Sequence, residues 1–220
     1  MSIVSRHDWW RLTAFGDSAV LLPFALLITV WLLARPATRR AGWLWLGVVL
    51  ADAGTVALSK LLYMGWGLHP PGLDFVGLSG HSAMSFLLWP VVGALVTARA
   101  RAPWRALAIA LGALLALAVT GSRLVLDAHT PSEAALGALW GALLAGVFLG
   151  LERRPGQLPA AGGWIALSLL LPLLLTYGQT FPSNRILAWV ALRVSGHAHI
   201  YTRADLQRRQ RLERLRMERG

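Results

Sequence analysis

Long apolar segments separated by short polar ones dominate the pattern of this chain. A helix needs about 20 apolar residues to cross the hydrocarbon core of a bilayer. Six segments approach that length, at residues 17–34, 43–61, 80–98, 104–121, 131–151 and 161–178. Because the connections between them are brief, the pattern predicts one all-α integral membrane bundle of about six transmembrane helices.

The segments at the two ends of the chain differ from the apolar runs. Residues 1–16 predict an interfacial N-terminal segment, and residues 17–180 predict the transmembrane domain. Residues 181–220 predict an interfacial segment followed by a basic tail, since the apolar stretch 185–200 is too short to cross a bilayer. No small-x-small site follows the first apolar run, and we therefore expect no cleavable signal.

Arginine placement predicts the orientation of the bundle. Eight arginines lie in the loops after the first, third and fifth spans: Arg35, Arg39, Arg40, Arg99, Arg101, Arg105, Arg153 and Arg154. The two intervening loops, 62–79 and 122–130, hold only Arg123. The positive-inside rule places the first set in the cytoplasm and the second set outside. With six spans, both ends of the chain are then external. An external position fits the Arg-rich tail poorly, because the rule places arginines on the cytoplasmic side.

Composition agrees with a membrane protein and excludes several other classes. Of the 220 residues, 56% are hydrophobic, and the mean hydropathy is +0.56. The absence of cysteine excludes disulfides and thiolate metal sites. The net charge of +11 does not indicate nucleic acid, because the arginines lie between apolar runs and in the tail. Lys60 is the only lysine.

Two short strings carry candidate chemistry, and both fall on the predicted outer face. The first is Ser79-Gly80-His81, at the start of the third span, and the second is Ser122-Arg123 followed by five residues and His129. A helix N-terminus with a glycine admits a phosphate to free backbone N–H groups, and arginine offers a planar cationic fork. Neutral imidazole can act as a nucleophile and imidazolium as an acid. Two histidines and nearby cations on one membrane face therefore indicate a phosphate site.

The second string has a closer resemblance. Ser122-Arg123, five residues, His129, three residues and Glu133 resemble the third signature of the type 2 phosphatidic acid phosphatase superfamily. Ser79-Gly80-His81 resembles the second signature, with Leu78 in place of its proline. The resemblance covers about residues 17–151.

The resemblance implies roles for individual residues. His129 is the expected nucleophile, which forms a phosphohistidine, and His81 is the expected acid for the leaving group. Lys60 is similar to the lysine that opens the first signature. With Ser79, Gly80 and Arg123, it is expected to hold the phosphoryl oxygens. The family needs no metal, and we expect neither a metal nor another cofactor.

This sequence departs from the family pattern at two positions. An arginine-proline pair should follow Lys60 by seven residues, but Gly67-Leu68 stands there and His69-Pro70 comes two positions late. His69 is thus a possible auxiliary cation. Glu133 replaces the aspartate that orients the nucleophilic histidine in the family. It lies four residues after His129, on the same helical face.

Several polar residues have a structural interpretation beside the functional one. Thr130-Pro131-Ser132-Glu133 is a capping box that starts a helix without any catalytic role. Asp127 is either a loop residue or an auxiliary contact of a histidine. Asp52 lies in the middle of a span, where we expect an interhelical hydrogen bond to satisfy it.

These observations predict a multi-pass enzyme of a bacterial cytoplasmic membrane. It would remove phosphate from a lipid phosphate or diphosphate at the periplasmic face. Its partners are then the bilayer and a lipid such as undecaprenyl diphosphate or a phosphatidate-type lipid, and no nucleic acid. Two alternatives stay open: a lipid phosphotransferase on the same scaffold, and a non-catalytic lipid-binding or transport protein. The sequence leaves the oligomeric state open.

Overall fold

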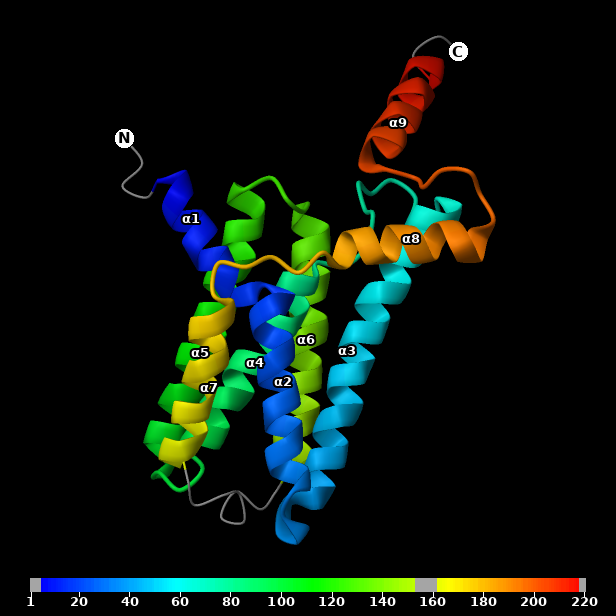
Figure 1. The fold of residues 1–220 in the computed structure, drawn as a ribbon. Helices are drawn as coiled ribbons and strands as arrows, with labels where there is room; N and C mark the ends of the chain where they lie inside the picture. The colour runs from blue at the N-terminus through cyan, green and yellow to red at the C-terminus, as the bar shows by residue number, and fades with distance from the viewer. Residues whose placement is uncertain (1–4, 153–161, 218–220) are drawn as a thin grey trace.

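All regular structure in the described residues, 5–152 and 162–217 of a computed structural model, is helical (Figure 1). The elements are α1 (Arg6–Thr13), η1 (Ala14–Gly16), α2 (Ser18–Leu33), η2 (Pro36–Thr38), α3 (Arg39–Trp66), α4 (Gly80–Val96), α5 (Ala102–Val125), α6 (Pro131–Leu151), α7 (Gly162–Thr176), α8 (Ser183–Ser195) and α9 (Arg203–Met217). The predicted all-α class is confirmed.

Within the described part of the chain, four helical segments are long and apolar enough to cross a membrane. They are Arg6–Leu33, Pro36–Trp66, Ala102–Val125 and Pro131–Leu151, and Gly80–Val96 is a shorter apolar helix. The chain is thus a multi-pass membrane protein. The predicted sixth span begins outside the described residues, and α7 covers most of the rest of it. α7 runs alongside the other helices of the bundle (Figure 1).

The central helix of the bundle is α4, which packs most extensively against α5 and α6. Leu87, Leu88 and Val91 of α4 are fully buried. Glycines allow the neighbouring helices to come close: a Cβ on Gly141 of α6 would lie 1.9 Å from the Ala83 carbonyl oxygen, and one on Gly112 of α5 would lie 2.4 Å from that of Trp89. Small residues at helix contacts are how apolar helices pack in lipid. This packing fixes the start of α4, where His81 lies.

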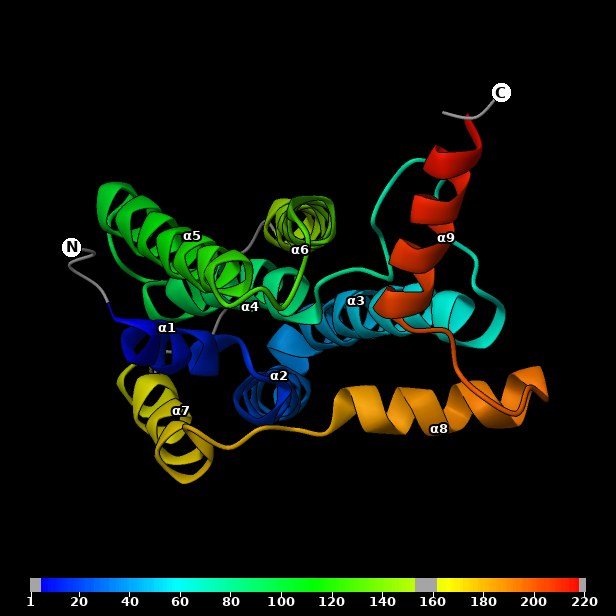
Figure 2. The same cartoon turned by 90° about the horizontal axis from the view of Figure 1, so that it is seen from above.

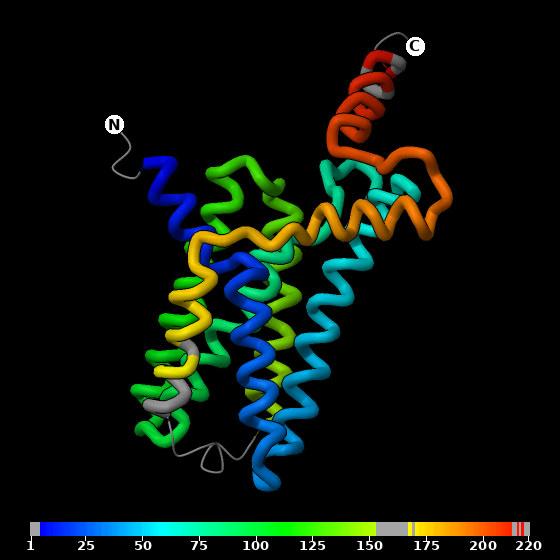
Figure 3. The backbone as a smooth tube through the Cα atoms, viewed as in Figure 1, coloured from blue at the N-terminus to red at the C-terminus, as the bar shows by residue number. Residues whose placement is uncertain are grey.

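Helices α1 and α9 and the loops 67–79 and 126–130 lie at one end of the bundle (Figure 1). Seen from above, α8 extends past α2 and lies beside α3 (Figure 2). Helix α8 packs against α3. The 13-residue α8 corresponds to the predicted interfacial segment. The segment between α7 and α8 crosses the same end of the bundle (Figure 3), where the Phe181 N–H donates to Asp17 Oδ1 at 3.0 Å.

Two helices extend further than the sequence predicted. α5 continues to Val125, and Ser122 and Arg123 therefore lie in its last turn, not in a loop. α3 continues to Trp66 and ends at Gly67, whose φ of 66° is in the left-handed region that favours glycine. Lys60 therefore lies inside α3, before its last turn. The predicted limits followed hydropathy, but nothing breaks either helix until these later residues.

Candidate active site

Two of the predicted site residues, His129 and Glu133, are in direct contact. His129 lies in the short loop between α5 and α6, and its Nδ1 is 2.7 Å from Glu133 Oε2. The His129 side chain is 10% exposed and that of Glu133 is fully buried. Because Nδ1 faces a carboxylate, it carries the proton, and Nε2 is left with a free lone pair. This is the tautomer that a nucleophilic histidine needs.

The start of α6 holds Glu133 in place. The Thr130 side chain accepts from the Glu133 N–H, and Glu133 Oε2 accepts from the Thr130 N–H at 3.2 Å, which completes a capping box. Glu133 Oε1 also accepts from the Val76 N–H at 2.7 Å. The structural and functional interpretations of Glu133 are therefore compatible, since the same carboxylate caps the helix and contacts His129.

One backbone contact closes the second string, and another joins it to the first. The His129 N–H donates to the Arg123 carbonyl at 3.3 Å, and the Ser79 N–H donates to the Glu133 carbonyl at 3.1 Å. Ser79 is the N-cap of α4, where its Oγ accepts from the Ser82 N–H at 3.4 Å and contacts Ser82 Oγ at 3.0 Å. The starts of α4 and α6 and the end of α5 therefore meet at one place.

His81 lies in the first turn of α4 and faces an aspartate from another helix. Its Nε2 is 3.6 Å from Asp17 Oδ2. Asp17 is the N-cap of α2, and its Oδ1 accepts from the Ala19 N–H at 2.8 Å as well as from Phe181. Asp17 is a contact that the sequence analysis missed, because it precedes His81 by 64 residues and belongs to no signature.

Arg123 contributes a guanidinium that is only partly satisfied. One terminal nitrogen donates to Thr13 Oγ1 at 2.9 Å. The Nε–H is buried and has no hydrogen-bond partner among the described residues. A buried donor without a partner is costly. This group is suited to an anionic ligand.

Two cavities meet at His81. One has a volume of about 340 Å³ and is lined by Thr13, Asp17, His81 and Arg123 among others. The other, of about 230 Å³, is lined by Lys60, Gly80 and His81 together with apolar side chains. His129 lines neither of these two cavities. Lys60 Nζ donates to Asn184 Oδ1 of α8 at 2.9 Å.

The cationic residues of the site interact electrostatically with one another and with the two histidines. Arg123 interacts with Lys60, His81 and His129. Burial lowers the pKa of His129, and the positive charges of Lys60 and Arg123 lower it further, while the hydrogen bond to Glu133 opposes the shift. His129 is therefore mostly neutral near pH 7, the form in which it can attack phosphorus.

Gly77 and Gly80 allow close packing around Lys60. A Cβ on Gly77 would lie 2.6 Å from Lys60 Cγ, and Gly77 has a φ of 131°. A Cβ on Gly80 would lie 3.3 Å from Val56. Loop 67–79 is thus held directly against α3 at the lysine.

Three predicted residues are placed differently from the catalytic candidates. His69 Nδ1 contacts the Pro70 carbonyl at 3.1 Å, and His69 lines neither cavity. Asp127 is an exposed loop residue with a φ of 54°. We expected an interhelical hydrogen bond at Asp52, and for its Oδ1 this prediction is wrong. Asp52 faces the cavity of Lys60, and Oδ1 is buried without a partner among the described residues.

Arg203 of α9 is the largest omission of the sequence analysis. It donates from one terminal nitrogen to both Glu133 oxygens, at 2.8 and 2.7 Å, and from the other to Asp74 Oδ1 at 2.6 Å. The sequence showed only an Arg-rich tail, in which no spacing distinguishes Arg203. Within residues 5–152 and 162–217, no three His, Cys, Asp or Glu side chains form a group that could hold a metal ion.

Comparison with known proteins gives two matches. The family model of the PAP2 superfamily matches residues 65–156, which include both histidine strings but not Lys60. The "Uncharacterized 22.5 kDa protein in cps region" of Klebsiella pneumoniae is 37% identical over 205 residues, which cover 91% of this chain and 98% of the relative. No solved structure matches.

Proposed function

Because this chain belongs to the PAP2 superfamily, we propose that it is a membrane phosphatase that hydrolyses a lipid phosphate or diphosphate through a phosphohistidine on His129. The observation that carries the proposal is the 2.7 Å contact between His129 Nδ1 and Glu133, beside the hydrogen bond from the His129 N–H to the Arg123 carbonyl. A carboxylate on Nδ1 leaves Nε2 free to attack.

The first step of the proposed reaction transfers the phosphoryl group to the enzyme. His129 Nε2 attacks phosphorus, the bond from phosphorus to the leaving oxygen breaks, and protonated His81 gives its proton to that oxygen. Glu133 stabilises the positive charge that develops on His129, in the way an orienting carboxylate does for other catalytic histidines. The products are the dephosphorylated lipid and phosphohistidine.

The second step restores the enzyme. Neutral His81 takes a proton from a water molecule whose oxygen attacks phosphorus, and the bond from phosphorus to Nε2 breaks. Inorganic phosphate leaves, and His81 is again protonated. We assign the negative oxygens in both steps to Arg123, Lys60, Ser79 and the backbone at Gly80.

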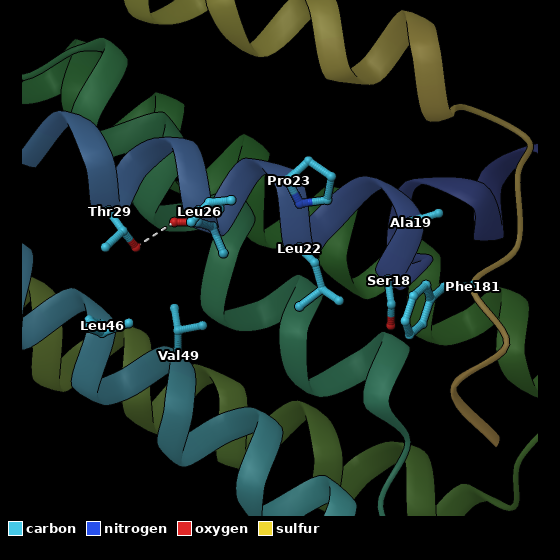
Figure 4. Close-up of a pocket in the computed structure, with 10 residues that line it drawn as sticks. Ser18, Ala19, Leu22, Pro23, Leu26, Thr29, Leu46, Val49 and Phe181 are labelled. Atoms are coloured by element: carbon cyan, nitrogen blue, oxygen red, sulfur yellow. Dashed lines mark hydrogen bonds between the residues drawn. The ribbon is translucent and has the colours of Figure 1, made fainter. Parts of the chain in front are cut away.

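An apolar groove supports a lipid as the substrate. A cavity of about 510 Å³ lies between α2 and α3, lined by Leu22, Pro23, Leu26, Leu46 and Val49 among others (Figure 4). It shares Ser18, Leu22 and Phe181 with the cavity of Lys60 and His81. A phosphate held at His81 would thus have a continuous apolar path for its hydrocarbon chain. Undecaprenyl diphosphate and phosphatidate-type lipids both fit this description.

We place the reaction at the periplasmic face of a bacterial inner membrane. The short loops 34–38 and 97–101, which carry arginines, lie at the end of the bundle opposite the α5–α6 loop (Figure 1), the loop to which His129 belongs. The positive-inside rule, which holds for short loops, assigns that opposite end to the cytoplasm.

Release of phosphate by the purified full-length protein in detergent tests the proposal. We expect phosphate from at least one member of a panel of lipid phosphates and diphosphates, with and without EDTA, and none from His129→Ala. His7→Ala is a matched control, because His7 is exposed and lines neither cavity near His81. A new phosphate ester of an added lipid or sugar alcohol, formed without release of free phosphate, would favour the phosphotransferase. Lipid binding without turnover would favour the non-catalytic alternative.

A further inference from the structure

The C-terminal segment contributes an arginine that bonds the side chain of Glu133. Arg203 is the first residue of α9, and its hydrogen bonds to Glu133 are 2.8 and 2.7 Å long, beside 2.7 Å for the contact of Glu133 with His129. The same guanidinium bonds to Asp74 in loop 67–79. Arg203 thus joins three parts of the chain: α6, the loop before α4, and α9.

The position of Arg203 is fixed by contacts on both sides of it. The Tyr201 N–H donates to the Met64 carbonyl at 2.9 Å, and the Tyr63 hydroxyl donates to the Thr202 carbonyl at 2.7 Å. Thr202 directly precedes α9, and its N–H donates to Asp205 Oδ2 at 2.8 Å. Leu206 is only 1% exposed. The start of α9 is therefore docked on the end of α3, although the tail is strongly basic.

The chemistry of the pair favours a role at Glu133. The fully buried carboxylate of Glu133 is costly in a low-dielectric site unless a cation and hydrogen bonds compensate it. Arg203 bonds both Glu133 oxygens from one terminal nitrogen and Asp74 from the other, so its planar guanidinium holds the two carboxylates in a fixed relation. Glu133 has one more methylene than the aspartate of the family pattern, and a longer side chain has more rotamers to restrict.

We propose that Arg203 is a positioning residue, which keeps Glu133 ionised and oriented toward His129 Nδ1. This inference rests on the proposed function, since it concerns the histidine to which the nucleophilic role is assigned. It makes the docked C-terminal segment part of the active site.

Removal of Arg203 should change the proton affinity of His129 in a defined direction. The charged or titratable groups around this histidine are Lys60 of α3, His81 of α4, Arg123 of α5, Glu133 of α6, Asp74 of loop 67–79 and Arg203 of α9. Arg203→Ala leaves two carboxylates without their shared cation, while the Val76 and Thr130 N–H groups still hold Glu133. The net negative charge added near His129 raises its pKa.

The experiment compares three full-length variants. Arg203→Ala should lose up to about 100-fold in kcat through misplacement of the nucleophile, and its acid limb should move to higher pH. Arg203→Lys keeps the charge but not the fork, and should recover part of kcat with an acid limb near that of the wild type. Arg208→Ala removes the same charge from an exposed position of α9 and should match the wild type.

A second readout keeps the inference independent of turnover. In protein labelled with ¹⁵N-histidine, the His129 signals, assigned by their loss in His129→Asn, should titrate at higher pH in Arg203→Ala than in the wild type. An unchanged His129 titration, or Arg203→Ala and Arg208→Ala that behave alike, would overturn the positioning role. If the wild type releases no phosphate from any lipid, the proposed function fails while this titration still tests Arg203. If Arg203→Ala does not fold, Arg203→Gln, which also removes the charge but keeps a long polar side chain, carries the same comparison.

Discussion

At the scale of single residues, the site depends on the several groups that the Glu133 carboxylate contacts at once. Its two oxygens accept hydrogen bonds from the Val76 and Thr130 backbone, and they also face His129 and Arg203. A side chain at the third position of a helix can reach back to the cap and across to the residue four positions earlier. A single carboxylate can therefore start α6, fix loop 67–79 and set the tautomer of His129.

Replacement of Glu133 by glutamine should separate orientation from capping. Gln can still accept from the backbone but lacks the negative charge, and we expect a loss of kcat of up to about 10⁴-fold, as for other orienting carboxylates. The hydrogen bond to Glu133 raises the pKa of His129, against the larger effect of burial. Its loss should lower that pKa further. Because the neutral form is the nucleophile, the acid limb should move to lower pH, opposite to Arg203→Ala.

The measurement is the pH profile of kcat/KM in Glu133→Gln, with thermal unfolding as a check of stability. Glu133→Asp is the matched control, since it keeps the charge and should retain more activity. A Glu133→Gln enzyme with the kcat and acid limb of the wild type would leave Glu133 only its capping role.

At the scale of elements, two helix N-termini converge on the site. α4 begins at Gly80 and α6 at Pro131, and the Ser79–Glu133 backbone hydrogen bond ties the two starts together. A helix N-terminus carries a partial positive charge and free N–H groups. The close packing of α4 against α6 at Gly137 and Gly141 thus brings two anion-favouring ends to the same place.

The groove between α2 and α3 predicts a dependence on chain length. Val49→Phe should partly fill the groove and lower kcat/KM roughly 10-fold for a long-chain lipid phosphate, because a displaced chain misplaces the phosphate. A short-chain analogue that ends before Val49 should be unaffected. Leu50→Phe is the matched control, since Leu50 is exposed on the same helix. Equal effects of Val49→Phe on long and short chains would exclude the groove as the chain site.

Local sequence patterns predicted where helices begin better than they predicted which distant residues contact the site. The helix starts at Ser79 and Thr130, and the proximity of Glu133 to His129, follow from spacings of three and four residues. Asp17 and Arg203 reach the site from the two ends of the chain, and no local spacing indicates them. The end of α5 was placed too early because hydropathy falls at Ser122, although the backbone stays helical to Val125.

At the scale of the whole molecule, the described arginines lie at both ends of the bundle. Those of the short loops lie opposite the site, whereas Arg203 and its neighbours in α9 lie on the side of the site (Figure 1). Only the short-loop set bears on orientation by the positive-inside rule, and a basic helix near a membrane can instead bind anionic headgroups.

The absence of cysteine makes the orientation directly measurable. In intact cells, a membrane-impermeant maleimide should label Leu68→Cys, in the exposed loop before α4, but not Ala100→Cys in the exposed loop before α5. Detergent permeabilisation should make both react. The reverse pattern in intact cells would place the site in the cytoplasm.

The central claim, that His129 carries the phosphoryl group, is tested most directly by trapping the intermediate. His81→Ala should be slowed roughly 10²–10⁴-fold on lipid substrates, and with an aryl phosphate, whose leaving group needs no acid, it should accumulate phosphoenzyme. Rapid alkaline quenching and peptide mapping should locate an acid-labile, base-stable phosphate on His129. Phosphate found on another residue, or turnover by His129→Ala at the rate of the wild type, would contradict the account.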